Sequence, residues 1–317
     1  MEIKIKLNDM KYRYDVYQMF NIYFPLDEIK FLDDGDYIVN ILDNKVEFIN
    51  GDYYNETISE NIKEDIKRLV FSSLKDITEE KYPWGILVGI RPSKIALKYL
   101  EEGKTEEEII EIFEKKHLAS KEKAKLCIEI AKREVSFVNN DSKNIAIYIG
   151  MAFCPTRCFY CSFAANPIMG NKKLVSPYLE ALIYEIREMK KYVDERSLNI
   201  ETVYFGGGTP TAVNNEEFEL IMQEAYDAFV KGKGIKEFTV ECGRPDSITK
   251  EKLETMKKFN VTRISINPQT MNDETLKIIG RGHNSKAVIE KFNLARSMGF
   301  NDINMDIIIG LPGEGIK

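Results

Sequence analysis

The chain has 317 residues, 44% of them hydrophobic and 30% charged, which is an ordinary globular composition and a length that allows two domains. Its 51 acidic and 45 basic residues give a net charge of −6, which argues against general binding to nucleic acid. No apolar run approaches the roughly 18 residues of a membrane span, and the first residues lack the apolar segment of a signal peptide. We therefore expect a cytoplasmic protein with no nucleic-acid or membrane partner.

The N-terminal part, residues 1–140, predicts a small α+β domain whose second half is helical and whose role the sequence does not indicate. Apolar residues alternate at 2–7 and 37–41, as in strands, and residues 60–78 have helical periodicity. Glycine-containing turn pairs predict tight connections at Asp34-Gly35 and Asn50-Gly51.

The pattern is helical from residue 91 to about residue 138. Gly103 followed by Thr105 predicts the end of one helix and the N-cap of the next. His117 lies in this charged helical region, and we expect it to be solvated. We interpret residues 139–142, Asn-Asn-Asp-Ser, as the linker to a second domain.

Strand and helix signals alternate over residues 144–317, which predicts a parallel sheet or barrel. The expected strands are residues 145–152, 202–205, 237–240, 263–266 and 304–309. The expected helices include one that begins at Ser176-Pro177, one around 218–229, one from Thr249 and one from Ser285. The predicted fold class is therefore α/β, a partial (β/α) barrel truncated after about five strands. Because the fifth strand would be an unprotected edge, we expect the natural protein to continue for at least one more βα unit.

Three cysteines with the spacing C-x3-C-x2-C follow the first of these strands: Cys154, Cys158 and Cys161. Short-spaced thiolates in a chain without signs of secretion indicate a metal site, and their odd number argues against disulfides. A structural zinc site needs four ligands. The remaining cysteines and histidines are isolated in sequence, namely Cys127, Cys242, His117 and His283. Three thiolates alone fit an iron–sulfur cluster with one iron left without a protein ligand.

Every expected strand ends in polar or glycine-rich residues, which is where reactive groups gather in a βα barrel. The glycine run 206–208 suits close approach of a ligand to the backbone, although it also fits a tight turn. A carboxylate such as Glu241 suits ribose hydroxyls, the alternative being a surface salt bridge. Arg281 suits a ligand carboxylate. Asp306, expected inside an apolar strand, should have a ligand or an arginine nearby.

The isolated cysteines and the second histidine have less specific interpretations. Cys127 and Cys242 are expected to be small buried hydrophobic residues. His283 follows Arg281-Gly282, where a hydrogen bond within a turn is the leading interpretation and a haem or proton-transfer role the alternative.

Taken together, five segments resemble the radical S-adenosylmethionine (SAM) coproporphyrinogen dehydrogenase family, the oxygen-independent coproporphyrinogen III oxidases, over residues 144–315. The segments are YIGMAFCPTRCFYCSF, YFGGGTPT, TVECGRPDSI, RISINPQTMNDETLKIIGRGH and NMDIIIGLPGEG. The segment WGILVGIRPSKI at 84–95 resembles the branch of the family with an extra N-terminal region. In the best-known enzymes a fourth cysteine stands where this chain has Phe163.

The resemblance implies that the three cysteines ligate a 4Fe-4S cluster and that one or two SAM molecules bind beside it. The implied SAM-binding residues are Tyr148, Tyr160, Gly207, Gly208, Thr209, Glu241, Gln269, Arg281 and Asp306. The implied activity is oxidative decarboxylation of coproporphyrinogen III propionates to vinyl groups, which gives protoporphyrinogen IX. An electron donor such as flavodoxin or ferredoxin would reduce the cluster.

The anionic propionates would need guanidinium partners, and the candidates are Arg91, Arg157 and Arg244. Two other functions fit the same resemblance. One is a haem-binding carrier on the same barrel, and the other is a radical SAM methyltransferase with a second SAM as methyl donor.

Overall fold

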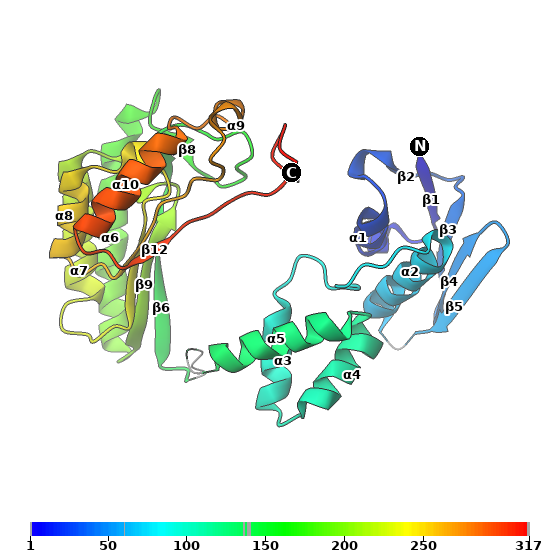
Figure 1. The fold of residues 1–317 in the computed structure, drawn as a ribbon. Helices are drawn as coiled ribbons and strands as arrows, with labels where there is room; N and C mark the ends of the chain where they lie inside the picture. The colour runs from blue at the N-terminus through cyan, green and yellow to red at the C-terminus, as the bar shows by residue number, and fades with distance from the viewer. Residues whose placement is uncertain (1, 60, 136, 138–140, 316–317) are drawn as a thin grey trace. The chain divides into compact units, whose positions relative to one another are not determined.

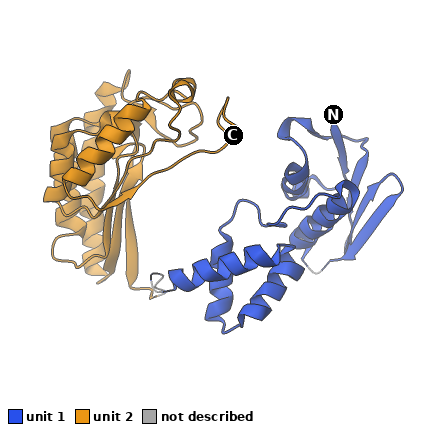
Figure 2. Ribbon diagram, in the orientation of Figure 1, with its two compact units in different colours: residues 1–139 blue, residues 140–317 orange. Residues whose placement is uncertain are grey.

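The computed structural model describes residues 2–59, 61–135, 137 and 141–315. The chain divides into two compact units, residues 1–139 and residues 140–317 (Figure 2). Of the predicted linker, residues 139 and 140 lie outside the described residues. All twelve predicted site residues belong to the second unit, since they run from Tyr148 to Asp306.

Unit 1 opens with a mixed sheet and two helices. Its elements are β1 (Ile3–Leu7), η1 (Met10–Tyr12), α1 (Arg13–Tyr23), η2 (Leu26–Glu28), β2 (Ile29–Phe31), β3 (Tyr37–Ile41), β4 (Lys45–Asn50), β5 (Tyr53–Ile58) and α2 (Ile62–Thr78). The strand order is β2-β1-β3-β4-β5, and β1 is parallel to both of its neighbours. Phe20 and Ile66, from the two helices, are fully buried with Phe48 of β4. The predicted turn at Asn50-Gly51 is confirmed, with Gly51 at a φ of +56° between β4 and β5.

Three further helices of unit 1 form a separate core around the fully buried Phe113. They are α3 (Pro92–Glu101), α4 (Glu106–His117) and α5 (Lys121–Glu134). The predicted N-cap at Thr105 is confirmed, since its hydroxyl accepts from the Glu108 N–H in a capping box. The expectation that His117 is solvated is wrong. His117 is only 9% exposed because it follows Phe113 by one helical turn and packs on that ring.

Unit 2 is built on a parallel sheet with helices between its strands, so the α/β prediction is confirmed. Its main elements are β6 (Asn144–Met151), α6 (Lys172–Glu195), β9 (Asn199–Gly207), α7 (Asn215–Phe229), β10 (Glu237–Glu241), α8 (Lys250–Lys258), β11 (Arg263–Ser265), α9 (Asp273–Ile278), α10 (Ser285–Ser297) and β12 (Asp302–Asn304). The order is β12-β11-β10-β9-β6, and all four pairings are parallel. Figure 1 shows α6, α7 and α8 together on one side of this partial barrel.

The two faces of the sheet differ in chemistry because successive side chains point to opposite faces of a strand. One face packs on the helices through apolar residues such as Ile149, Phe205 and Val240, which are buried in a single core. The residues between them point the other way. They include Tyr148, Tyr204, Thr239, Glu241 and Ser265. The strand pairing places Tyr204 between Tyr148 and Thr239, and Glu241 beside Ser265. The carboxyl end of this second face is therefore polar.

The predicted fifth strand is wrong in its position. The observed β12 ends at Asn304, and among the described residues that follow it only Ile307 forms a bridge, to Gln269. Pro268 has no N–H to give to a ladder, and the side-chain oxygen of Asn267 accepts from the Asp306 N–H at 3.2 Å. Asp306 therefore lies on the loop after the strand and not inside an apolar strand.

The start of α6 also differs from the prediction. The helix begins at Lys172, one turn before the expected Ser176-Pro177, so that Pro177 is inside it. The extra turn buries Val175, which is 6% exposed. The short helices α1 and α9 had no prediction of their own.

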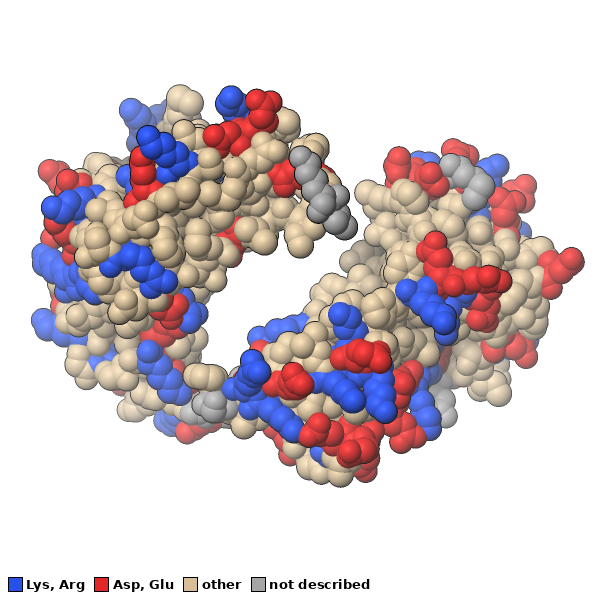
Figure 3. All heavy atoms as spheres, in the orientation of Figure 1, with Lys and Arg blue, Asp and Glu red and all other residues tan. Residues whose placement is uncertain are grey.

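The surface agrees with the weak net charge. Figure 3 shows acidic and basic side chains interspersed on the visible face of each unit. Among the described helices, none combines the length and the apolar character that crossing a membrane requires.

Gly208 holds the sheet against the loop that follows β6. A Cβ at this position would lie 2.4 Å from the backbone oxygen of Phe153. We predict that Gly208→Ala lowers the free energy of unfolding of unit 2 by about 3 kcal/mol, the upper end of the usual overpacking costs. A urea-unfolding series measures this change.

Gly150→Ala is the matched control, because its Cβ would meet only the Tyr148 ring at an ordinary 3.6 Å. Its effect should stay within about 1 kcal/mol. Equal losses in the two variants would contradict the packing argument.

Candidate active site

A cavity of about 350 Å³ opens at the carboxyl end of the parallel sheet in unit 2. It contains eleven of the twelve predicted site residues, namely Cys154, Cys158, Tyr160, Cys161, Gly207, Gly208, Thr209, Glu241, Gln269, Arg281 and Asp306. The twelfth, Tyr148, does not line it. Residues from all five strand ends thus converge on one space of a size usual for small-molecule sites.

The cysteine loop is attached at its base and in its middle. It starts at β7 (Phe153–Cys154), which pairs with β8 (Asn166–Pro167), and it turns tightly where the Cys161 N–H donates to the Cys158 oxygen at 3.1 Å. The Phe159 N–H donates to the Ile279 oxygen at 3.0 Å. The loop is therefore fixed at its base and in its middle.

The glycine-rich end of β9 lies directly against the start of this loop. Gly207 has a φ of +93°, which favours glycine. The N–H groups of Gly208 and Thr209 donate to the oxygens of Met151 and Phe153, each at 2.7 Å. The segment continues into the short helix η3 (Pro210–Ala212).

Thr209 also reaches the first cysteine, since its hydroxyl donates to Cys154 Sγ at 3.3 Å. Burial raises the pKa of the Cys154 thiol, while this hydrogen bond and the nearby Arg244 charge favour the thiolate. The site thus contains groups that stabilise the ligating form of a buried cysteine.

Glu241 stands at the end of β10 and accepts a hydrogen bond from the Tyr204 hydroxyl. Tyr148 stacks on Tyr204, with ring centroids 5.7 Å apart, and is 63% exposed. Its contact with the cavity is therefore indirect, through Tyr204 and Glu241. Sequence reasoning missed Tyr204, although the alternation of β9 places it on the polar face.

Gln269 and Asp306 are positioned by backbone hydrogen bonds between the last two strand ends. Gln269 has a φ of +63°, an uncommon conformation for a residue with a side chain, and its N–H donates to the Asp306 oxygen at 2.9 Å. Asp306 accepts from the side-chain amides of Asn267 at 2.7 Å and Asn304 at 2.9 Å. Asp306 was expected to have a ligand or an arginine nearby, and the side-chain partners that the structure gives it are amides.

Arg281 joins the cysteine loop to the third strand end. Its guanidinium donates to the Gly243 oxygen at 3.0 Å and to the Tyr160 hydroxyl at 2.7 Å. Its buried Nε has no hydrogen-bond partner among the described residues. A buried donor without a partner indicates a place for a ligand acceptor.

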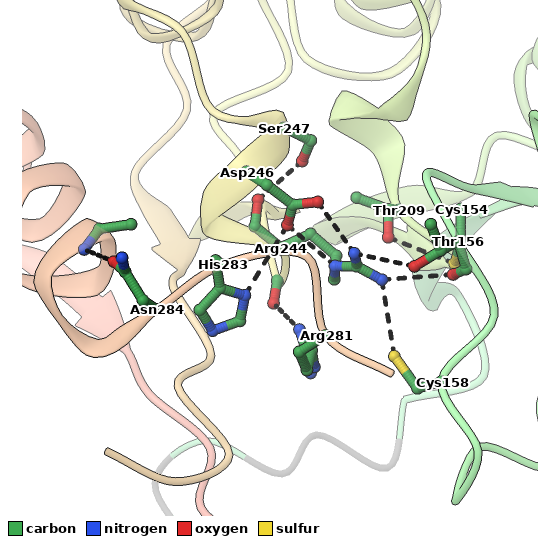
Figure 4. Close-up of polar contacts among 12 residues, drawn as sticks. Cys154, Thr156, Cys158, Thr209, Arg244, Asp246, Ser247, Arg281, His283 and Asn284 are labelled. Carbon is green, nitrogen blue, oxygen red and sulfur yellow. Dashed lines mark hydrogen bonds and ion pairs between the residues drawn. The ribbon is translucent and has the colours of Figure 1, made fainter. Parts of the chain in front are cut away.

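Arg244 lies beside the cysteine loop, with its guanidinium directed at Thr156 and Cys158 as Figure 4 shows, and its side chain is only 4% exposed. It donates to Asp246, to Thr156 and to Cys158 Sγ. These contacts correct the expectation that Arg244 binds a propionate, because the guanidinium is buried and already paired. Arg157 remains exposed and lines the cavity. Arg91, in unit 1, lies 3.8 Å from Glu134.

The predictions for the isolated residues have mixed outcomes. Cys127 and Cys242 are buried, as predicted. The expected turn hydrogen bond of His283 is wrong, because neither ring nitrogen has a hydrogen-bond partner among the described residues. Its Nδ1 lies 3.8 Å from Asp246, too far for a hydrogen bond.

The donor set fits a cubane cluster better than a single ion. In the part of the chain that the structure describes, no three His, Cys, Asp or Glu side chains gather closely enough to hold one metal ion. A zinc ion needs all its ligands around one point, about 2.0–2.3 Å away. A cluster instead takes thiolates at separate corners, and all three cysteines line the same cavity.

Glu241 has a raised pKa because it is buried and because Asp306 lies nearby, while the Tyr204 hydroxyl and the Gly207 N–H oppose the rise. An acid of this kind stabilises the fold while it is protonated and loses that contribution as pH rises through its folded pKa. We predict that Glu241→Gln raises the unfolding temperature of the ligand-free protein at neutral pH by roughly 2–4 °C. The gain over the wild type should grow as pH rises above the ordinary value of 4.5.

Thermal melts from acid to neutral pH measure this difference. The control is Glu237→Gln, at the other end of β10, which removes an ion pair with Arg263 at 3.3 Å and should give no gain. A Glu241→Gln gain that is independent of pH would contradict the electrostatic explanation.

Comparison with known proteins agrees with this site. The family model of the radical SAM superfamily matches residues 148–317. The oxygen-independent coproporphyrinogen-III oxidase-like protein HemZ of Bacillus subtilis (strain 168) is 41% identical over 280 residues, which are 87% of this chain and 56% of HemZ. The heme chaperone HemW of the same organism is 35% identical over 170 residues, which are 54% of this chain and 44% of HemW.

Among solved structures, the coproporphyrinogen III oxidase HemN from Escherichia coli, described as a radical SAM enzyme, matches with a TM-score of 0.48 and 25% identity. The match covers 53% of this chain and 38% of HemN. The chain spans about half the length of the curated relatives that it matches. Since the family model covers more than half of the chain, the protein belongs to the radical SAM superfamily.

Proposed function

We propose that this chain forms the radical SAM part of an enzyme that converts propionate side chains of coproporphyrinogen III to vinyl groups, giving protoporphyrinogen IX. The observation that carries the proposal is the convergence of the cysteine triplet and the polar strand ends on one cavity. The similarity to HemZ, whose name describes it as coproporphyrinogen-III oxidase-like, supports the choice of substrate.

In this proposal, Cys154, Cys158 and Cys161 hold a 4Fe-4S cluster and SAM binds beside it. The proposed SAM contacts are Tyr160, Gly207, Gly208, Thr209, Glu241, Gln269, Arg281 and Asp306, with Tyr148 acting through Tyr204. When bound, the reduced cluster and SAM together supply one-electron cleavage of a carbon–sulfur bond and, from it, hydrogen-atom abstraction.

The residues of this chain hold and orient these groups. Gly208 lets the end of β9 lie directly against the start of the cysteine loop, because any side chain there would collide with the backbone of Phe153. The Glu241 carboxylate, oriented by Tyr204, suits ribose hydroxyls. The free Nε of Arg281 suits a ligand carboxylate. Arg157 is the exposed guanidinium that suits a propionate.

Each vinyl group would form when a propionate gives one hydrogen atom to the adenosyl carbon derived from SAM, gives one electron to a separate one-electron acceptor and loses CO2, and two propionates react. A low-potential donor of the flavodoxin or ferredoxin class would reduce the cluster. All five cysteines are free, which suits the reducing cytoplasm that we propose for this protein.

A haem-carrier function is the second candidate, because chaperones named HemW are among the similar proteins. Such a carrier needs a haem ligand outside the cysteine triplet. The available side chains, His117, His283, Cys127 and Cys242, are all buried. This gives the carrier function less support than the oxidase-like function. A methyltransferase function has no separate support from the site.

We predict that the anaerobically reconstituted protein, given SAM, dithionite and coproporphyrinogen III, releases CO2 and forms vinyl products that mass spectrometry detects. Cys161→Ala should lose cluster iron and SAM cleavage. The matched control, Cys127→Ala in unit 1, should keep both, because Cys127 lies in a separate core.

The other outcomes separate the alternatives. SAM cleavage without decarboxylation would contradict the substrate assignment. Tight haem binding with little SAM turnover would favour the carrier. S-adenosylhomocysteine as a product would favour methyl transfer.

A further inference from the structure

The buried Arg244 has a full set of partners beside the cysteine loop. Two of its nitrogens donate to the two oxygens of Asp246, Nε at 3.0 Å and Nη2 at 2.9 Å. Nη2 also donates to the Thr156 hydroxyl at 3.0 Å. Nη1 donates to the Thr156 backbone oxygen at 3.2 Å and to Cys158 Sγ at 3.5 Å. Each of the five N–H donors of the guanidinium thus has one acceptor.

This arrangement is costly to build, because burying a charge is unfavourable unless it is paired and hydrogen-bonded. The carboxylate of Asp246 provides the pairing in the bidentate geometry that Arg favours. Although burial alone would raise the pKa of Asp246, the hydrogen bonds and the charge of Arg244 hold that pKa below its usual range. The pair therefore stays ionised, with the cation directed at the cysteine loop.

The base of Arg244 is rigid, so the guanidinium cannot easily leave the loop. It precedes the short helix η4 (Pro245–Ser247), and both the N–H and the hydroxyl of Ser247 donate to the Arg244 oxygen, at 2.9 and 2.8 Å. The buried Lys252 donates to the oxygens of Thr211 and Ser247, at 2.7 and 3.3 Å. Figure 4 shows Arg244 between Asp246 on one side and Thr156 and Cys158 on the other.

We propose that Arg244 is a positioning residue that raises the reduction potential of the cluster by donating a charged hydrogen bond to the Cys158 sulfur. Reduction adds one electron to a group that is already negative. A fixed cation in a site of low dielectric stabilises the added charge more than a solvated one could. Hydrogen bonds to cysteine sulfurs are also a recognised means of setting the potential of such clusters.

The competing explanation is that Arg244 only braces the loop through Thr156. Bracing explains the two contacts with Thr156, but a neutral side chain could supply these. It does not require a buried positive charge, nor a donor aimed at a ligating sulfur. The inference rests on the cluster assignment of the proposed function but not on its substrate.

The experiment is a redox titration of the reconstituted cluster, followed by electron paramagnetic resonance, in the wild type, Arg244→Gln and Arg244→Lys. Arg244→Gln should lower the equilibrium constant for one-electron reduction at least tenfold, which is 59 mV. Arg244→Lys keeps the positive charge but loses the planar guanidinium. The reduction potential of its cluster should therefore lie between those of the wild type and Arg244→Gln. Iron and sulfide contents and apo-protein melts accompany each titration.

Arg263→Gln is the matched control. Arg263 is also an arginine paired with carboxylates on this sheet, Glu237 at 3.3 Å and Asp302 at 2.9 Å, but it stands at the amino end of β11. This variant removes the same charge and should leave the potential unchanged.

Each result decides the proposal. An unchanged potential in either Arg244 variant overturns it, because the charged bond to sulfur then has no effect. If both variants unfold before they lose the cluster, Arg244 only braces the fold and the proposal is wrong. A variant with a wild-type melt that loses the cluster counts against the proposal, because Arg244 then retains the cluster and is not shown to set its potential. A lowered potential supports the proposal whether or not the protein decarboxylates coproporphyrinogen III. Failure of the substrate assignment can therefore be told apart from failure of this proposal.

Discussion

Parallel pairing of five strands is the constraint on which the rest of unit 2 depends. It places the carboxyl ends of all five at one edge, so that Cys154, Glu241 and Asp306, far apart in sequence, share one cavity. It also gives the sheet one apolar face for the helices and one polar face. The apolar face supplies the burial that stabilises the unit, which frees the polar face for ligands.

The cysteine loop has little structure of its own and depends on this edge for its position. It is attached on one side by the backbone bonds of Gly208 and Thr209, and on the other by the Ile279 oxygen. Arg244 also contacts Thr156 and Cys158. The ends of β9 and β10 and the end of helix α9 therefore fix a loop that sequence alone would describe as irregular.

Much of this arrangement could be predicted from the sequence, and what failed has a physical cause. The alternation of strand and helix signals placed four strands of the sheet, and eleven of the twelve site residues, most of them implied by the family resemblance, line the cavity. The fifth strand was misplaced because the side chain of Asn267 competes with the ladder for the Asp306 N–H. That competition depends on the tertiary contact and leaves no trace in periodicity.

The role of Arg244 was misjudged for a related reason. An arginine near the end of a strand has the same sequence signal whether it faces a substrate or is buried beside a loop. Only the fold brings Thr156 and Cys158 to its free nitrogens. The environment of His117 was likewise set by packing on Phe113, although the surrounding residues are charged.

The charged side chains around the cavity form two groups, one acidic and one basic. Glu241 stands at the end of β10 and Asp306 on the loop after β12, and the pKa of Glu241 is raised by burial and by the nearby charge of Asp306. Arg244 and Arg281 stand between the sheet and the cysteine loop. A ligand with a cationic centre and a carboxylate, as SAM has, would relieve the repulsion in the acidic group and satisfy Arg281 in the basic group. Ionised Glu241 destabilises the ligand-free protein at neutral pH. We therefore expect binding of such a ligand to raise the free energy of unfolding at that pH.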